Sequence, residues 1–241
     1  MTSLAIDIGN TSIKYAVFDN QSMIHNQRIM GHDVEQLANE VEEYHPTQAI
    51  VCTTASLTEQ QQTTLRQLTK HTMFLSHTTP IPIRNLYKTP ETLGMDRLAA
   101  AVGAYMQVKG NVLIIDMGTA ITYDFVDSEG NYRGGNIAPG MQMRLKALHD
   151  YTARLPYVEV EGAHPNLGED TETAIRCGVI DGIRYEIEGY LRQFFLKYHN
   201  LSVFFTGGDE LYFEDEIKKR IFADKLLVLK GLNEILSYNL K

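Results

Sequence analysis

A short motif with chemically useful residues occurs twice in the chain. Each copy consists of an apolar stretch, an Asp-x-Gly turn and a second apolar stretch, at 4–19 and again at 113–127. Glycine lets backbone N–H groups approach an anion closely, and the aspartate can hold a metal ion on that anion. One such turn is usually an ordinary turn, but two copies after buried strands favour a phosphate site. Two hairpin tips facing each other across a cleft could hold a nucleoside triphosphate.

The first turn offers the two kinds of group that a phosphate site needs, namely hydrogen-bond donors with a positive charge for the phosphate oxygens and a carboxylate for a metal ion. It comprises Asp7, Ile8, Gly9, Asn10 and Thr11, and Ser12-Ile13-Lys14 follows directly. Backbone N–H groups and the Asn10 or Thr11 side chain can donate to phosphate oxygens, and Lys14 adds a point charge. Asp7 can bind Mg²⁺ directly or through water.

A carboxylate and a guanidinium stand side by side before an Ala-rich stretch, in Leu93-Gly94-Met95-Asp96-Arg97. Phosphoryl transfer depends mainly on positioning, so Asp96 could accept the hydrogen bond of an attacking hydroxyl. Arg97 could hold a carboxylate of the acceptor through paired hydrogen bonds. Alternatively, Asp96 is simply a helix N-cap and Arg97 a solvated side chain. Residue types alone leave both interpretations open.

Other polar and glycine-rich segments are less specific. Thr206-Gly207-Gly208 follows an apolar strand and could let a flat base such as adenine lie against the backbone, although Gly-Gly is also a common turn. Gly134-Gly135 and the later Pro139-Gly140 could shape a cleft wall or turn the chain. The eight histidines show no spacing typical of a zinc site. The acidic residues between 209 and 216 are expected on a solvated helix face.

Hydrophobic periodicity predicts the elements that must position these residues. Helices are expected at 33–45 with Asp33 as N-cap, 58–71, 95–108, 140–153, 171–199, after residue 208, and at 231–240. Strands are expected at 3–8, 12–19, 22–30, 48–53, 73–75, 112–116, up to 127 in the second hairpin, 131–137, 202–206 and near 226–229, with a loop at 77–92. Strand hairpins followed by helices, twice over, predict two α/β halves, 1–110 and 111–241, with mixed sheets and a cleft at their junction.

Composition limits the partners. The 241 residues carry a formal net charge of −8, which argues against broad binding to nucleic acid or anionic membranes. The two cysteines form no disulfide framework, as is typical of a reducing compartment. Residues 1–20 lack the features of a signal peptide, and no apolar run is long enough to span a membrane. We expect a cytoplasmic protein with neither nucleic acid nor membrane as partner.

Taken together, these motifs resemble the type III pantothenate kinases of the acetate and sugar kinase/Hsc70/actin superfamily. The most specific piece is Tyr87-x-x-Pro90-x-x-Leu93-Gly94-x-Asp96-Arg97, whose long fixed spacing is peculiar to this family. The two Asp-x-Gly turns match the two phosphate motifs of the family. The remaining matches are Gly134-Gly135-x-Ile137-x-Pro139-Gly140, Leu155-Pro156, Thr171-x-x-Ala174-x-x-x-Gly178 and Thr206-Gly207-Gly208.

The resemblance implies an α/β fold of two duplicated ribonuclease H-like (actin-like ATPase) halves around a central cleft. It also implies ATP-dependent phosphorylation of the terminal hydroxyl of pantothenate, the first step of coenzyme A synthesis. Mg²⁺ would accompany ATP, and a monovalent cation, K⁺ or NH₄⁺, would bind Asp116. The family is dimeric, so a homodimer is expected.

The resemblance also assigns roles to residues. Asp96 is implied as the catalytic base that accepts the hydroxyl proton. ATP contacts are implied for Asp7, Ile8, Gly9, Asn10, Thr11, Ser12, Ile13, Lys14 and Thr119. Pantothenate contacts are implied for Tyr87, Gly94, Met95, Asp96 and Arg97, and for Thr171 from the partner subunit.

Two alternatives belong to other classes: a non-catalytic transcription accessory factor of the same family, and another small-molecule kinase or a polyphosphate hydrolase of the superfamily. A regulator that had lost catalysis should lack an acid among Asp7, Asp96 and Asp116, yet all three are present.

Two acidic residues, Asp209 and Glu210, directly follow the Gly-Gly turn that resembles the nucleotide end of the family's site. Carboxylates that faced the nucleotide there would repel its phosphates. We expect them to point to solvent.

Overall fold

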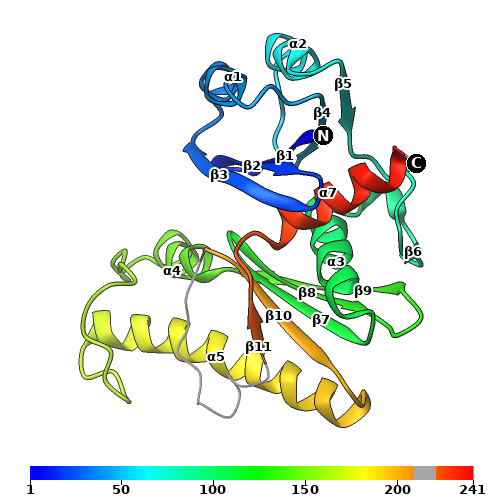
Figure 1. Ribbon diagram of the computed structural model, residues 1–241. Coiled ribbons are helices and arrows are strands. Elements are labelled where there is room, and N and C mark those ends of the chain that lie inside the picture. Colours follow the sequence, from blue (N-terminus) through cyan, green and yellow to red (C-terminus); the bar gives the residue numbers. More distant parts are fainter. Residues whose placement is uncertain (209–220, 241) are drawn as a thin grey trace. The chain divides into compact units, whose positions relative to one another are not determined.

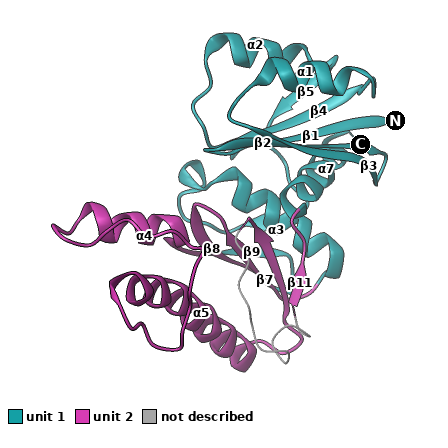
Figure 2. Cartoon of the chain, turned by 90° about the vertical axis from the view of Figure 1, so that its left-hand side faces the viewer, with its two compact units in different colours: residues 1–109, 126–134, 226–241 teal, residues 110–125, 135–225 magenta. Residues whose placement is uncertain are grey.

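The computed structural model describes residues 1–208 and 221–240 (Figure 1). The chain divides into two compact units (Figure 2). Unit 1 comprises residues 1–109, 126–134 and 226–241, and unit 2 comprises residues 110–125 and 135–225. The predicted boundary at residue 110 lies beside the break after Lys109, whereas the C-terminal residues are grouped with unit 1 rather than with the second half of the sequence.

Unit 1 is built on a mixed five-stranded sheet with the order β3-β2-β1-β4-β5. The first three strands are antiparallel neighbours, and β4 and β5 run parallel to β1 and β4 respectively. The first four coincide closely with predicted strands, whereas β5 begins two residues before the strand predicted at 73–75 and takes His71 from the helix predicted at 58–71. Their bounds are Thr2–Ile8 for β1, Ser12–Asp19 for β2, Ser22–Met30 for β3, Gln48–Thr53 for β4 and His71–Phe74 for β5.

Helices cover both faces of this sheet (Figure 1). The helices α1 (Val34–Glu42) and α2 (Glu59–Gln67) bury Leu37 and Leu65 against the even-numbered residues of β1. On the other face α7 (Leu227–Asn239) packs on β1 and β4, and α3 (Met95–Val108) packs on α7 and β4. Asp33 caps α1 as predicted, its side chain accepting the Gln36 N–H.

The helices α3 and α7 approach closely because each has a glycine at the contact. A Cβ on Gly231 would overlap the Ala99 carbonyl and the Gly103 backbone, and a Cβ on Gly103 would overlap the Leu227 carbonyl. The two backbones therefore touch at this crossing, which ties the C-terminal helix to the helix that carries Asp96.

The second sheet has six strands in the order β11-β10-β7-β8-β9-β6. Its strands are β6 (Arg84–Asn85), β7 (Val112–Met117), β8 (Ala120–Val126), β9 (Asn131–Pro139), β10 (Ser202–Gly207) and β11 (Ile221–Ala223). Within unit 2, the helices α4 (Met141–Asp150) and α5 (Thr171–Lys197) bury Leu145 and Ile183 against Ile115 and Tyr123 of this sheet. The long helix is continuous through its glycines, as predicted.

Two predictions about the elements were wrong. The apolar run at 226–229 was expected as a strand, but it lies at the start of α7, and the strand of this region is β11. Short apolar runs do not distinguish a buried strand from a buried helix turn, and here the contact with α3 favours the helix. The loop predicted at 77–92 contains β6 and a 3₁₀ turn at Pro90–Thr92. In the described ranges no helix combines the length and hydropathy needed to span a bilayer.

Candidate active site

The first Asp-x-Gly turn is a tight connection between β1 and β2. The Gly9 N–H donates to the Ser12 carbonyl (3.1 Å), and the Gly31 N–H donates to the Thr11 carbonyl (2.9 Å). The His32 ring donates from Nε2 to the Gly9 carbonyl (2.7 Å). Asn10 and Thr11 are exposed at the tip. The turn is therefore held by hydrogen bonds to its backbone, while the Asn10 and Thr11 side chains at its tip are exposed.

Strand register places a row of ionisable side chains on one face of the unit 1 sheet. Asp7 pairs with Lys14 on β2 and with Cys52 on β4, and Lys14 pairs with Arg28 on β3. Paired residues on neighbouring strands project to the same side. The Arg28 Nε also donates to the Ser12 hydroxyl (3.0 Å). Two cations thus follow the Asp7 carboxylate across three strands, which suits an anionic ligand.

The negative charges of Asp7 and Asp96, which are 89 positions apart in the sequence, both raise the pKa of one buried thiol, that of Cys52. Burial raises the pKa of Cys52 well above its ordinary value, and the charges of Asp7 and Asp96 raise it further. Cys52 therefore stays a neutral thiol and places no third negative charge beside the two carboxylates. All three residues belong to unit 1, so the fold of this unit brings the first turn and the start of α3 together.

Asp96 lies in the first turn of α3 but is not its N-cap, which is Gly94. Its Oδ1 accepts the Arg97 backbone N–H (2.8 Å). A Cβ on Gly94 would lie 2.5 Å from this oxygen, so glycine leaves the space that the carboxylate occupies. The N-cap interpretation of Asp96 is thus wrong, and so is that of Arg97 as a solvated side chain, since Arg97 is only 8% exposed.

Tyr87 and Met95 complete the segment that the family resemblance marks for the acceptor. Tyr87 is half-buried, and its ring lies beside Tyr132, with the ring centroids 6.2 Å apart. Gly134 has a φ of +107°, and a Cβ there would lie 3.4 Å from the Tyr87 ring. Gly134 therefore meets the Tyr87 segment within unit 1, a contact that linear spacing did not predict. Met95 is half-buried at the first position of α3.

In unit 2, two glycine segments converge on the second Asp-x-Gly turn. Asp116 is at the end of β7, where it pairs with Thr206 of β10. The Gly140 N–H donates to the Thr119 carbonyl (3.1 Å), and the Gly208 N–H donates to the Met117 carbonyl (3.0 Å). A Cβ on Gly140 or Gly207 would overlap the backbone of this turn. The fold thus joins three motifs that are far apart in the sequence.

A partly buried hydrogen-bond network supports this arrangement. Glu186 on α5 accepts from the Tyr123 hydroxyl and from the Arg144 guanidinium, both at 2.7 Å. Arg144 also donates to the Pro139 carbonyl (2.7 Å), next to Gly140. Burial and the Glu186 carboxylate raise the pKa of Tyr123, so its hydroxyl stays protonated and donates. The network fixes the segment that contacts Thr119.

Thr171 lies apart from the turns, as the first residue of α5, and its side chain is exposed. It lines a hollow of about 760 Å³ in unit 2, together with mainly apolar residues such as Leu148, Leu155, Ile175 and Val179.

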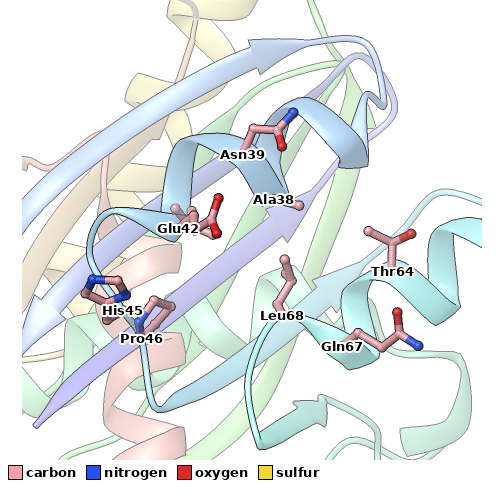
Figure 3. Close-up of a pocket in the computed structure, with 9 residues that line it drawn as sticks. Ala38, Asn39, Glu42, His45, Pro46, Thr64, Gln67 and Leu68 are labelled. Carbon is pink, nitrogen blue, oxygen red and sulfur yellow. The ribbon is translucent and has the colours of Figure 1, made fainter.

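Another hollow, of about 520 Å³, lies between α1 and α2 in unit 1 (Figure 3). It contains none of the predicted site residues. Asp209 and Glu210 lie outside the described residues.

Sequence reasoning missed Arg28, His32 and Cys52 as neighbours of the predicted site residues. Arg28 lies on β3, which pairs with β2, and His32 lies in the loop after β3. Cys52 lies on β4, the parallel neighbour of β1. No spacing in the sequence relates these residues to Asp7, because only the register of four strands does so.

Comparison with known proteins gives a consistent result. The sequence model of the family described as type III pantothenate kinase matches residues 3–193. A protein from Bacteroides fragilis named type III pantothenate kinase is 51% identical over 238 residues, covering 98% of each chain.

Solved structures show the same fold at low sequence identity. A Campylobacter jejuni protein described as a Baf family transcriptional activator superposes with a TM-score of 0.62 at 21% identity, covering 98% of each chain. A Listeria monocytogenes protein described as an N-acetylmannosamine kinase superposes with a TM-score of 0.53 at 13% identity, covering 100% of each chain. These likenesses confirm the predicted α/β architecture with two mixed sheets. The match to the family model and the 51% identity together show that this chain belongs to the type III pantothenate kinase family.

Proposed function

We propose that this protein transfers the γ-phosphoryl group of ATP to the terminal hydroxyl of pantothenate, the first step of coenzyme A biosynthesis. The family membership supports this activity. The observation that carries the mechanism is that Asp7 pairs with Cys52 of β4, while α3, whose first turn holds Asp96, packs on the same strand. A phosphate motif and a candidate base therefore belong to one unit.

The first turn is assigned to the ATP phosphates. The exposed tip at Asn10 and Thr11 offers donors, and Lys14 and Arg28 offer positive charge on the same face as Asp7. A carboxylate is the kind of ligand that Mg²⁺ prefers, so Asp7 fits a magnesium ion, which would neutralise charge on the phosphates. In unit 2, Thr119 is assigned to ATP and the Asp116 carboxylate to a monovalent cation, K⁺ or NH₄⁺.

Asp96 is assigned as the base. The pantothenate hydroxyl donates its proton to the Asp96 carboxylate while the hydroxyl oxygen forms a bond to the γ-phosphorus. The bond from that phosphorus to the β–γ bridging oxygen breaks, and ADP leaves with the electron pair. Such a transition state is loose, so a carboxylate held in place is sufficient even when it is a weak base. The Arg97 N–H bond and the space beside Gly94 hold Asp96 in place.

The remaining assignments concern recognition and assembly. Arg97 holds the pantothenate carboxylate, Tyr87, Gly94 and Met95 line the acceptor site, and Thr171 contacts pantothenate from the partner subunit of a homodimer. The hollow beside Thr171 is mainly apolar, as a surface covered by a second copy would be. We assign the protein to the cytoplasm, where its two free cysteines would stay reduced.

Product identification tests the proposal. Purified protein with Mg-ATP and pantothenate should form 4′-phosphopantothenate, seen by mass spectrometry as one added phosphoryl group per pantothenate. A protein that hydrolyses ATP without forming this product would contradict the assignment of the acceptor.

A further inference from the structure

Three side chains with different metal-ligating atoms meet on unit 2, apart from the turns assigned to ATP. His164 comes from the segment before α5, and Cys177 and Asp181 are four residues apart on α5 itself. The His nitrogen, the Cys sulfur and a carboxylate oxygen all lie within 4.8 Å of one another. Residues four apart share one face of a helix, so the helix presents the sulfur and the carboxylate together to the segment that carries His164.

The distances suit a tetrahedral ion. Nε2 of His164 lies 3.3 Å from Oδ2 of Asp181. Two ligand atoms that are each about 2.0–2.1 Å from a tetrahedral Zn²⁺ lie about 3.3 Å apart. The Cys177 sulfur lies within 4.8 Å of both atoms, and its bond to Zn²⁺, at about 2.3 Å, is longer than those of nitrogen and oxygen.

The segment carrying His164 is fixed to α5 on both sides of the histidine. The buried Arg176 donates to the Glu159 and Ala163 carbonyls, each at 3.0 Å. The Cys177 thiol donates to the Pro165 carbonyl, also at 3.0 Å. Gly162 adopts a φ of +130° against the Arg176 guanidinium. The ligand set is therefore preorganised.

The second carboxylate oxygen of Asp181 has a partner of its own. Oδ1 accepts from the Arg184 guanidinium (3.0 Å), which leaves Oδ2 directed toward His164. Partners of this kind orient metal ligands and raise the affinity of the site. The Cys177 sulfur is buried, whereas the side chains of His164 and Asp181 are 38% and 18% exposed, so an ion can enter from solvent.

We propose that His164, Cys177 and Asp181 form a binding site for a borderline divalent cation, with Zn²⁺ as the best match. A thiolate and an imidazole select such ions over Mg²⁺, which prefers oxygen ligands. On binding, the Cys177 thiol releases its proton to solvent and its hydrogen bond to Pro165 is replaced by the sulfur–metal bond. Thiolate and carboxylate then balance the charge of the ion, and water completes the tetrahedron. The ion links the 159–165 segment to α5.

Cobalt is a direct probe, because a thiolate bound to Co²⁺ gives a charge-transfer band in the near ultraviolet. The full-length protein is stripped with a chelator, transferred to chelator-free buffer and titrated with Co²⁺. The band should saturate at one equivalent per chain, and Zn²⁺ should abolish it whereas excess Mg²⁺ should not.

Variants separate this site from other ligands. Cys177→Ser should lose the band, and His164→Gln and Asp181→Asn should weaken Co²⁺ binding at least about tenfold, since losing even an outer-shell partner of a metal ligand costs about that much. Cys52→Ser, which removes the other thiol, and His149→Gln, which removes an exposed imidazole, should keep it. His164 is on the surface, so its variant remains informative if Cys177→Ser does not fold. Absence of a saturable band, or a band unchanged in Cys177→Ser, would overturn the proposal. The readout involves no turnover and is thus independent of the kinase activity.

Discussion

At the residue scale, the role of Asp96 can be separated from nucleotide binding. Replacing Asp96 by Asn keeps the shape and the acceptor for the Arg97 N–H but removes the proton acceptor. We expect kcat to fall by about 100-fold or more, the usual loss for a general base, while ATP binding is kept. Steady-state kinetics and calorimetric ATP titration measure the two effects. Asp19→Asn, on an exposed strand end, is the matched control. Unchanged turnover would remove Asp96 from the mechanism.

A second prediction at the residue scale concerns the role of Arg97. Its burial indicates a defined partner rather than a solvated position. We expect Arg97→Ala to raise the KM for pantothenate by about 10- to 100-fold, as the loss of charge-assisted hydrogen bonds predicts. The KM for ATP should change far less. Initial rates with each substrate varied in turn provide the measurement, and equal effects on both KM values would place Arg97 elsewhere.

Much of the residue-scale picture follows from the sequence. The spacing from Tyr87 to Arg97 and the two Asp-x-Gly turns are sufficient to propose Asp7, Asp96 and Asp116 as the functional acids. Spacing could not identify Arg28 beside Lys14 or Cys52 beside Asp7, because these neighbours depend on which strands pair and in which register. Spacing also could not predict that His164 lies beside Cys177 and Asp181, because this contact depends on how the segment before α5 folds back on the helix.

At the element scale, the contact between α3 and α7 requires glycine. Gly231→Ala should lower the free energy of unfolding by about 1–3 kcal/mol, because the added methyl overlaps the Ala99 carbonyl. Gly189→Ala on α5 is the matched control, since a Cβ at Gly189 would meet no atom within 4 Å, and it should stabilise by about 0.5–1 kcal/mol. Urea denaturation measures both. A neutral Gly231→Ala would mean that the two backbones can separate at no cost.

The turn between β8 and β9 should make stability depend on pH. Burial alone would raise the pKa of Asp127, but hydrogen bonds from Asn131 and Arg133 outweigh it and leave the pKa lowered. A lowered folded-state pKa stabilises the protein above the unfolded value of about 3.9, and this contribution is lost as pH falls through the folded value. The difference in unfolding free energy between wild type and Asp127→Asn should therefore shrink below about pH 4. A difference that stays constant from pH 7 to pH 3 would contradict this account.

Elements were predictable where their pattern was long and regular. The helix 95–108 and the strand 48–53 were predicted with the bounds that the structure has, because one is rich in good helix formers and the other is apolar from Ala49 to Cys52. The run at 226–229 was misassigned because its four apolar residues fit either state, and only the packing of α7 on α3 decides between them.

At the scale of the whole molecule, the duplication seen in the sequence corresponds to two sheets, each with an Asp-x-Gly turn after a buried strand. The grouping of α7 with unit 1 could not be predicted, because chain order gives no information on which core a terminal helix joins. The two turns fall in different units, so the proposed kinase needs both units folded.

An ADP-release assay tests the central claim most directly. Purified protein is given Mg-ATP with and without pantothenate, once in K⁺ and once with only Na⁺. We predict turnover that requires both pantothenate and K⁺, because the proposal assigns Asp96 to the pantothenate hydroxyl and Asp116 to the cation. ATP turnover that does not depend on pantothenate, or no turnover in either salt, would contradict the assignment as a pantothenate kinase.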